Sequence, residues 1–571
     1  MVIRLLENEK PQSVNNKEGQ ALCSPKENKH WVNMDIKQLR EVTDNLFSDR
    51  LTYVQLLQEI AENFYPERAD FTIRRSHGTE FAGDLMTSYP ILTRRDLGDQ
   101  ISTMLRPTEK EWFKMAAGHG EKVDNEGLRW LERASNVQRR AMYSRPTQFT
   151  RASKEADHDF AAFGQCVVSV RMNQAADNLL YRNWHLRDVV WTENAEGAIG
   201  LIGRKWKPTV RDLVGLFPGK CHEKVARVAE KTPFAKINCY HIVVESDMYS
   251  GNAMGKPYWS LYYDVENQTL LEAVPVWNQE YIISRWQTVS GSQYAYSPAT
   301  ITALPDARLI QSMTYALLEA GEKAVNPPII ATQDVVRSDV SLYAGGITWV
   351  DAEYDEKFGA ALRPMPLDLR GLPFGAEMAR ESREMIAQAF FLNKLTMPRD
   401  GVEKTAYEIG QMVQEYIRGA LPIFEPMEQE RNGQTCEMTF DVLMRAGAFG
   451  SPHDIPRSLG GEVIFEFQSP LHDAIDAQKG QKFLESKAML AEALAIDPTA
   501  IHMLDTGTAL RDALTGAGVP AEWIHSKEDV ELAMQKQKDD EDQSMQLAQM
   551  QQGADVAETL GNASQSLGEQ I

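Results

Sequence analysis

Two glycines and a lysine within residues 215–220 could form a phosphate-binding loop, since backbone amides and an ammonium group are what such loops offer to phosphate. The spacing argues against this function. Only three residues separate Gly215 from Gly219, where a nucleotide-binding loop has four, and Cys221 follows Lys220 in place of a magnesium-binding serine or threonine. Pro218 also removes one backbone donor. The segment is therefore predicted to be an ordinary turn.

Asp157, His158 and Asp159 are consecutive and belong to the residue types that bind metals or transfer protons. A single tripeptide without further ligands is weak evidence, and a solvated helix face is the favoured interpretation. The 11 histidines include no HExxH pattern. The acidic residues 539–542 indicate a solvated charged run. The sequence thus predicts no catalytic residue, no metal site and no cofactor.

The formal net charge of the chain is −21. This argues against a protein whose main task is to grip nucleic acid, because phosphate binding needs clustered lysine and arginine. It leaves open a protein past which DNA slides, because a conduit should adhere only weakly. The five cysteines are odd in number and contain no CxxC pair, which indicates a reducing compartment and no structural zinc. No run of 18 apolar residues occurs, so no membrane contact is expected.

The elements that must carry these residues are predicted from the spacing of apolar side chains. Helical spacing is found in residues 35–65, 94–105 and 125–143. From residue 165 the pattern changes to short β segments separated by turn residues, at 166–170, 199–202, 240–244, 258–263 and 281–283. No βαβ alternation is present, so the predicted fold class is α+β, with an antiparallel meander and without a doubly wound parallel sheet.

The second half of the chain is predicted to be mainly helical. Helices are expected at 306–326 and 375–395, separated by an irregular segment rich in strand formers, and from 474 past 534. A long helix is expected over 405–447, kinked by Pro422 and Pro426, because each proline removes a backbone donor and clashes with the preceding turn. Both ends of the chain are rich in polar and charged residues. Residues 1–34, which carry no secretory signal, and 530–571 are predicted to be disordered.

A series of loose motifs in a fixed order resembles the portal (head-to-tail connector) proteins of short-tailed bacteriophages. The first motif, Tyr294-Ala295-Tyr296-Ser297-Pro298, has Ala295 and Tyr296 where the family has glycine and arginine. The resemblance extends over residues 35–529, and the series is more specific than any single motif. The other motifs are residues 204–218, Ala303-Leu304-Pro305-Asp306, Asn326-Pro327-Pro328, Gln388-Ala389-Phe390-Phe391, Thr405-Ala406-Tyr407-Glu408-Ile409, Glu428-Gln429-Glu430, Met444-Arg445-Ala446-Gly447 and Ser469-Pro470-Leu471.

The resemblance implies a portal fold that assembles as a ring, usually of twelve subunits, at one vertex of the virion. Each subunit would have a helical and antiparallel-β wing, a two-helix stem, a small α/β clip and a helical crown. The implied divisions are the wing at 35–303, stem helices at 304–326 and 374–395, the clip at 327–373, a tunnel loop at 396–404, a kinked wing helix and β segment at 405–468, the crown at 469–529 and an acidic, glutamine-rich tail at 530–571.

The same resemblance implies the partners. Lys394, Arg399 and Lys404 of the tunnel loop would touch the backbone of double-stranded DNA without reading its sequence. A solvated connector loop is the competing interpretation. The clip would bind the terminase packaging ATPase and later the tail adaptor, through an exposed turn with Ser338, Tyr343, Gly345 and Gly346. Major capsid and scaffolding proteins would be further partners of a ring assembled in the host cytoplasm.

The dimensions agree with this expectation. A 21-residue first stem helix spans about 32 Å. Twelve such helices placed ~9–10 Å apart form a circle of about 110–120 Å, or ~37 Å across between axes. Subtracting one helix diameter of ~10 Å leaves a bore of roughly 27 Å, which admits a DNA duplex. The subunit number in this calculation comes from the family.

One alternative stays open from sequence: a soluble enzyme or an accessory virion protein with no recognisable catalytic motif. A ring-forming protein without turnover would be distinguished from it by electron microscopy. The sequence does not identify the phage, the exact subunit number or the tail protein that docks.

Overall fold

A computed structural model describes residues 34–107 (apart from 75, 77 and 81), 111–118, 125–331, 362–365, 371–392, 427–451 and 462–468, with Ile3, Arg4 and scattered single positions elsewhere. The chain divides into two compact units. The larger comprises Asn8–Phe113 and Asn136–Gly450, and the smaller comprises Met1–Glu7, Lys114–Ser135 and Ser451–Ile571.

The N-terminal helices of the larger unit begin where the sequence predicts them. Asp35 and Gln38 form a reciprocal capping box before α1 (Ile36–Asp49). The single helix predicted over 35–65 is wrong, because the chain breaks at Arg50 before α2 (Leu51–Phe64). Arg50 is buried, and one of its guanidinium nitrogens donates to the carbonyls of Leu186 and Val189, at 2.9 and 2.7 Å. A tertiary contact therefore sets this break.

Three more helices follow. The predicted helix 94–105 is α3 (Tyr89–Leu105), which begins five residues earlier, and the predicted helix 125–143 is α4 (Asn125–Met142). The sequence indicated a helix face at residues 157–159 but not the bounds of α5 (Phe149–Phe163), which is followed by Gly164 with a φ of 71°. Short 3-10 turns η1 (Pro66–Arg68), η2 (Arg145–Thr147) and η3 (Leu186–Asp188) connect neighbouring elements.

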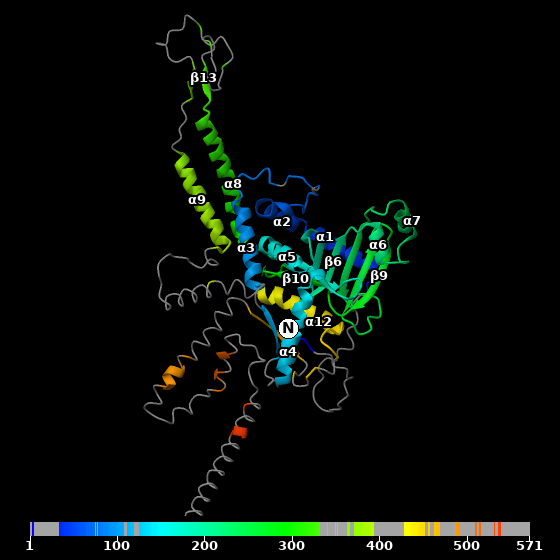
Figure 1. Cartoon of the computed structure of the whole chain (residues 1–571). Helices are drawn as coiled ribbons and strands as arrows, with labels where there is room; N and C mark the ends of the chain where they lie inside the picture. The colour runs from blue at the N-terminus through cyan, green and yellow to red at the C-terminus, as the bar shows by residue number, and fades with distance from the viewer. Residues whose placement is uncertain are drawn as a thin grey trace, which may run out of the picture. The chain divides into compact units, whose positions relative to one another are not determined.

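The predicted meander is confirmed for its central part. A fully antiparallel sheet has the order β5-β6-β7-β8-β9, and Figure 1 shows it beside α1. Its strands are β5 (Val189–Glu193), β6 (Ile199–Trp206), β7 (Cys239–Glu245), β8 (Tyr258–Asp264) and β9 (Thr269–Val276). Two short helices, α6 (Val210–Leu216) and α7 (Glu223–Lys231), are inserted between β6 and β7.

The first and last predicted β segments do not belong to that meander. They form a second antiparallel sheet, β10-β3-β4, in which Tyr281 lies opposite Ser169. Its strands are β3 (Gln165–Met172), β4 (Leu179–Trp184) and β10 (Tyr281–Arg285). A two-stranded pair, β11 (Gln287–Thr288) and β12 (Ala295–Tyr296), leads to the next helix.

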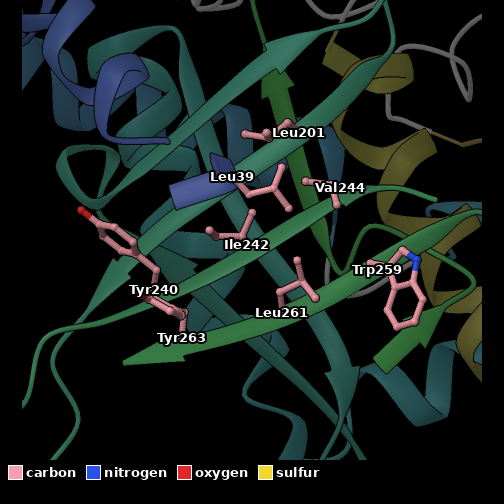
Figure 2. Packing of buried hydrophobic residues seen from close by; sticks show 8 residues of the cluster. All are labelled: Leu39, Leu201, Tyr240, Ile242, Val244, Trp259, Leu261 and Tyr263. Carbon is pink, nitrogen blue, oxygen red and sulfur yellow. The ribbon is translucent and has the colours of Figure 1, made fainter. Parts of the chain in front are cut away.

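One core of the larger unit lies between α1 and the meander. Figure 2 shows Leu39 of α1 among side chains from the strands β6, β7 and β8. These side chains are Leu201, Tyr240, Ile242, Val244, Trp259, Leu261 and Tyr263. Gly203 allows this approach, since a Cβ there would lie 2.4 Å from the Thr43 methyl carbon.

The remaining helices differ from prediction mainly at their ends. The helix expected at 306–326 is α8 (Pro298–Val325), which begins eight residues earlier because Ser297 caps it and Pro298 occupies its first turn. The helix expected at 375–395 is α9 (Gly371–Ala389).

Between α8 and α9 in the chain, β13 (Ile329–Ala331) pairs with β14 (Leu362–Pro364). In the predicted helix 405–447, the described part after residue 426 is a π-helix, η5 (Glu428–Gly433), followed by α12 (Gln434–Arg445).

The smaller unit contains a three-stranded sheet with the order β1-β15-β2. Its strands are β1 (Ile3–Arg4), β15 (Glu462–Phe467) and β2 (Phe113–Ala117). Ile3 and Arg4, which fall inside the segment expected to be disordered, pair with Val463 and Glu462.

Candidate functional site

The helical pair α8–α9 is the most extended feature of the described larger unit. The two helices pack side by side, and Figure 1 shows β13 following the end of α8. Small side chains permit close packing, because a Cβ on Gly375 would lie 3.1 Å from the Leu317 side chain. The buried residues of the pair include Ala303, Ala307, Ile310, Ala379, Ser382 and Ile386. With 28 residues, α8 is about 42 Å long.

The start of α8 is joined to α5 by hydrogen bonds. The hydroxyls of Ser297 and Thr300 donate to the carbonyls of Ala161 and Ala162, each at 2.8 Å. Gly164 must be a glycine here, because a Cβ would lie 2.0 Å from the Tyr296 carbonyl carbon. The first turn of α8 is therefore fixed to the body of the unit.

The middle of α8 is held by polar contacts from two other segments. Arg308 donates to Glu59 of α2 at 2.7 Å. The Gln311 side chain accepts from the backbone amides of Met86 and Thr87, at 2.7 and 3.0 Å. These contacts fix the direction in which α8 leaves the body.

The outer surfaces of α8 and α9 combine exposed apolar residues with balanced charge. Tyr315, Leu318 and Val325 on α8, and Phe374 and Met385 on α9, are exposed. Each helix carries three carboxylates and two cations, so each has a formal charge of −1. Such a surface would offer no strong attraction to phosphate.

The tripeptide Asp157-His158-Asp159 is not a solvated helix face, and that prediction is wrong. Both carboxylates are buried in α5, where guanidinium groups compensate their charge. Asp157 accepts hydrogen bonds from Arg106 and forms an ion pair with Arg431 at 2.8 Å. Burial disfavours the charged form of Arg431, but Asp157, Cys166 and Asp159 together outweigh it and raise the pKa of Arg431 above its ordinary value.

The second carboxylate of the tripeptide has its own partners. Asp159 accepts from Arg68 of η1 at 3.0 Å and from Asn183 of β4 at 2.7 Å. The pKa of His158 is lowered by burial and by the adjacent Arg94. The tripeptide is thus a structural junction that ties α5 to its neighbours, since the carboxylates are occupied by guanidinium and amide groups.

A second buried polar cluster lies between the two sheets. His241 of β7 contacts the Tyr281 hydroxyl at 2.5 Å and the Ser260 hydroxyl at 2.8 Å through its two ring nitrogens, and Arg204 donates to Tyr281 at 2.7 Å. Burial, then the charges of Arg204 and Arg171, hold the pKa of His241 well below its ordinary value. The cluster is enclosed, and its hydrogen bonds join polar side chains of the two sheets where these meet. The only sequence signal was a histidine inside an apolar strand.

The predicted turn at residues 215–220 is confirmed. α6 ends at Leu216, Gly219 has a φ of 75°, and the Lys220 ammonium is bound to Glu272 at 2.7 Å. Burial raises the pKa of Cys166 and Cys436, which disfavours their nucleophilic thiolate forms. Among the described residues, no group of three or more histidines, cysteines or carboxylates is arranged to hold a metal ion.

The site residues predicted from sequence lie outside the residues that the structure describes. They are Lys394, Arg399 and Lys404 in and directly before the tunnel loop, Ser338, Tyr343, Gly345 and Gly346 of the clip, and Pro422 and Pro426 of the helix kink. They stay predictions. In the described part of the chain, no helix is long and apolar enough to span a membrane.

Comparison with known proteins gives concordant matches. The profile of the family described as "Bacteriophage head to tail connecting protein" matches residues 36–524. The "Probable portal protein" of Bordetella phage BPP-1 is 22% identical over 534 residues, which cover 91% of this chain and 94% of that protein. The "Portal protein" of Salmonella phage epsilon15 is 20% identical over 490 residues, with 83% and 86% coverage.

A solved structure titled "Virion of native gene transfer agent (GTA) particle" matches with a TM-score of 0.32 and 10% identity, covering 75% of this chain and 95% of that chain. The family profile spans most of the chain. The chain therefore belongs to the bacteriophage head-to-tail connecting (portal) protein family.

Proposed function

We propose that the chain forms a ring at one capsid vertex and serves as the conduit through which the phage genome is packaged and ejected. The observation that carries this proposal is the α8–α9 pair, whose apolar residues Tyr315, Leu318, Val325, Phe374 and Met385 are at least half exposed in the described part of one subunit. In a ring, neighbouring subunits would cover them through a heterologous interface that closes on itself. The role is structural and not catalytic.

The rest of the pair agrees with a channel lining. With about 42 Å of helix along the axis and the roughly 27 Å bore expected for twelve subunits, a duplex could slide through. The formal charge of −1 on each helix would limit adhesion of the phosphate backbone.

Ring assembly is tested by light scattering and negative-stain microscopy of the purified chain. Wild type should form closed rings at micromolar concentration. Leu318→Asp should remain folded by circular dichroism and lose rings, because a carboxylate would be buried between subunits. Val289→Asp, an exposed position outside the pair, is the matched control and should keep them. A monomeric wild type would contradict the proposal.

The clip, residues 327–373, is proposed to bind the terminase ATPase during packaging and then the tail adaptor. β13 and β14 form an antiparallel pair at its two ends, so the intervening chain leaves and returns at one point. Deleting residues 338–348 should leave rings intact and abolish tail attachment in an assembly reaction. Tail attachment at normal yield would exclude this segment as the docking site.

The tunnel loop, residues 396–404, with the preceding Lys394, is proposed to touch DNA weakly. Residues 394–404 carry a net charge of +1, from three cations and two carboxylates. Changing Lys394, Arg399 and Lys404 together to glutamine should leave rings intact and reduce the genome retained in filled heads, with a salt-dependent effect. Normal retention at every salt concentration would mean that the loop only connects two helices.

Capsid and scaffolding proteins are proposed as further partners at the vertex, with assembly in the host cytoplasm.

A further inference from the structure

The insertion between β6 and β7, residues 207–236, concentrates positive charge in an acidic chain. It contains seven lysines and arginines and three carboxylates, a net of +4, whereas the whole chain has −21. All seven cationic side chains are exposed. Lys220 and Arg227 are paired with Glu272 and Glu223. For the other five, no side-chain hydrogen bond or ion pair is formed with a described residue: Lys207, Arg211, Lys224, Lys231 and Lys236.

The fold brings four of these five cations onto neighbouring segments. Lys224 and Lys231 are seven residues apart on α7, hence on the same helix face, two turns from each other. The chain then returns beside α6, since the Arg211 amide donates to the Pro233 carbonyl at 3.0 Å and Thr209 pairs with Lys236. Arg211 and Lys236 are thereby brought beside the end of α7.

The opposite face of the insertion packs against the sheet, and this packing fixes the orientation of the charged face. Val210 and Leu213 of α6 and Val225 of α7 pack with Cys239 of β7 and Leu271 of β9. Figure 1 shows α6 and α7 against the sheet and separate from α8. Like charges on neighbouring segments repel one another, and a bound polyanion would relieve that repulsion.

We propose that this basic insertion binds the backbone of double-stranded DNA, without sequence preference, at a site distinct from the channel. A duplex carries a charge about every 1.7 Å along its axis, so dispersed, flexible cations can all find phosphates without a shaped pocket. The backbone of the insertion is already hydrogen-bonded within α6, α7 and the Thr209–Lys236 bridge, which leaves little edge for adding a peptide strand.

The inference rests on the proposed function in one respect: genome DNA is the polyanion that a head-to-tail connector meets. An acidic protein segment is the competing occupant, because Leu216, Val228 and Phe234 are also exposed in the insertion. The experiment must therefore separate DNA from acidic protein, and the insertion from the channel.

The test measures binding of the full chain to a fluorescent duplex of about 30 base pairs, between about 50 and 200 mM salt. Changing Lys224, Lys231 and Lys236 to glutamine should weaken binding at least about tenfold at low salt and reduce the slope of log affinity against log salt by about 3. The control changes Lys37, Arg151 and Lys154 to glutamine, which removes the same charge from exposed positions outside the insertion. It should bind within about twofold of wild type.

Equal binding by the two triple variants would overturn the proposal. So would poly-glutamate that binds wild type as tightly as the duplex and loses binding in the insertion variant, since the occupant would then be an acidic protein. Negative-stain images of the same samples report on rings independently. Absent rings would count against the proposed conduit, whereas intact rings with equal duplex binding would count against this site alone.

Discussion

The buried charge of Asp157 is compensated by cationic partners, and the stability of the fold depends on that compensation. Its carboxylate accepts hydrogen bonds from Arg106 and forms an ion pair with Arg431. Asn432 accepts a hydrogen bond from Arg106 and donates one to the Leu105 carbonyl, which links this group to the end of α3. Removing one member leaves the remaining charges buried without compensation, which costs far more than an exposed pair can contribute.

Asp157→Asn should therefore destabilise the chain by about 3–5 kcal/mol. The control is Glu155→Gln on the same helix, where the carboxylate is exposed and paired with Arg151 at 2.9 Å, and the expected change is within about 0.5 kcal/mol. Chemical denaturation of both variants and wild type at one protein concentration measures the difference. Equal midpoints would show that the junction is not a determinant of stability.

His241 makes stability depend on pH. Its pKa in the folded chain is well below the ordinary value because of burial and the nearby arginines. At a pH just below the ordinary value, the His241 ring therefore stays neutral in the folded chain and takes up a proton in the unfolded chain. Stability is retained above the ordinary pKa of about 6.5 and falls as pH drops below it, by up to about 1.4 kcal/mol per pH unit. Glu280, 3.7 Å away, has a raised pKa from burial and acts in the opposite direction.

His241→Gln should reduce the acid-induced fall of the melting temperature between pH 7.5 and 5.5, whatever its effect at pH 7.5. His158 and His185, whose pKa values are also lowered chiefly by burial, remain in the variant and supply the residual slope. An unchanged slope would mean that His241 is protonated in the folded chain.

At the scale of elements, α8 is defined by its attachment to α5 as much as by its own sequence. Ser297 both caps α8 and donates to the Ala161 carbonyl, so the beginning of the helix and its anchorage are the same feature. Pro305 lies inside the helix, in the turn after these contacts, where proline would ordinarily be unfavourable. Packing of the first turns offsets that cost.

Gly164→Ala should disrupt this attachment severely. Its φ of 71° is unfavourable for alanine, and the added Cβ would overlap the Tyr296 backbone. The control is Gly219→Ala, at a φ of 75° with open space around it, which should cost about 1 kcal/mol from backbone strain alone. Soluble yield and melting temperature check the pair of variants. Similar losses in both would mean that the α5–α8 contact tolerates a shift.

At the scale of the whole molecule, charge is distributed unevenly. Without residues 207–236, which carry +4, the chain of −21 would have −25, so this segment concentrates positive charge in an otherwise acidic chain. Such a distribution would suit the conduit proposed above, because strong adhesion of DNA would be limited to local segments.

Residues beyond Asp529 are predicted to be dispensable for the ring, because they offer charge and glutamine in place of apolar residues that could form a core. A chain truncated after Glu528 should give rings of unchanged diameter in negative stain. Light scattering should give the same number of subunits per ring as for the full chain. Loss of rings on truncation would assign the tail a part in assembly.

Periodicity alone determined much of this protein. It identified α3 and α4, the central strands of the meander and the α+β class, because apolar spacing records which face of an element is buried. The order of motifs indicated the family before any fold was known, whereas the predicted functional residues lie in segments that the structure does not describe.

Tertiary structure alone decided the rest. Tertiary contacts of Arg50 separate α1 from α2, and β10 pairs with β3 across more than a hundred residues. Asp157 and Asp159 are buried, although the sequence predicted that they would be exposed to solvent. A carboxylate is normally exposed unless a cation is brought to it. Arg106 and Arg431, distant in sequence, become partners of Asp157 only when the chain folds, so no local pattern could reveal the junction.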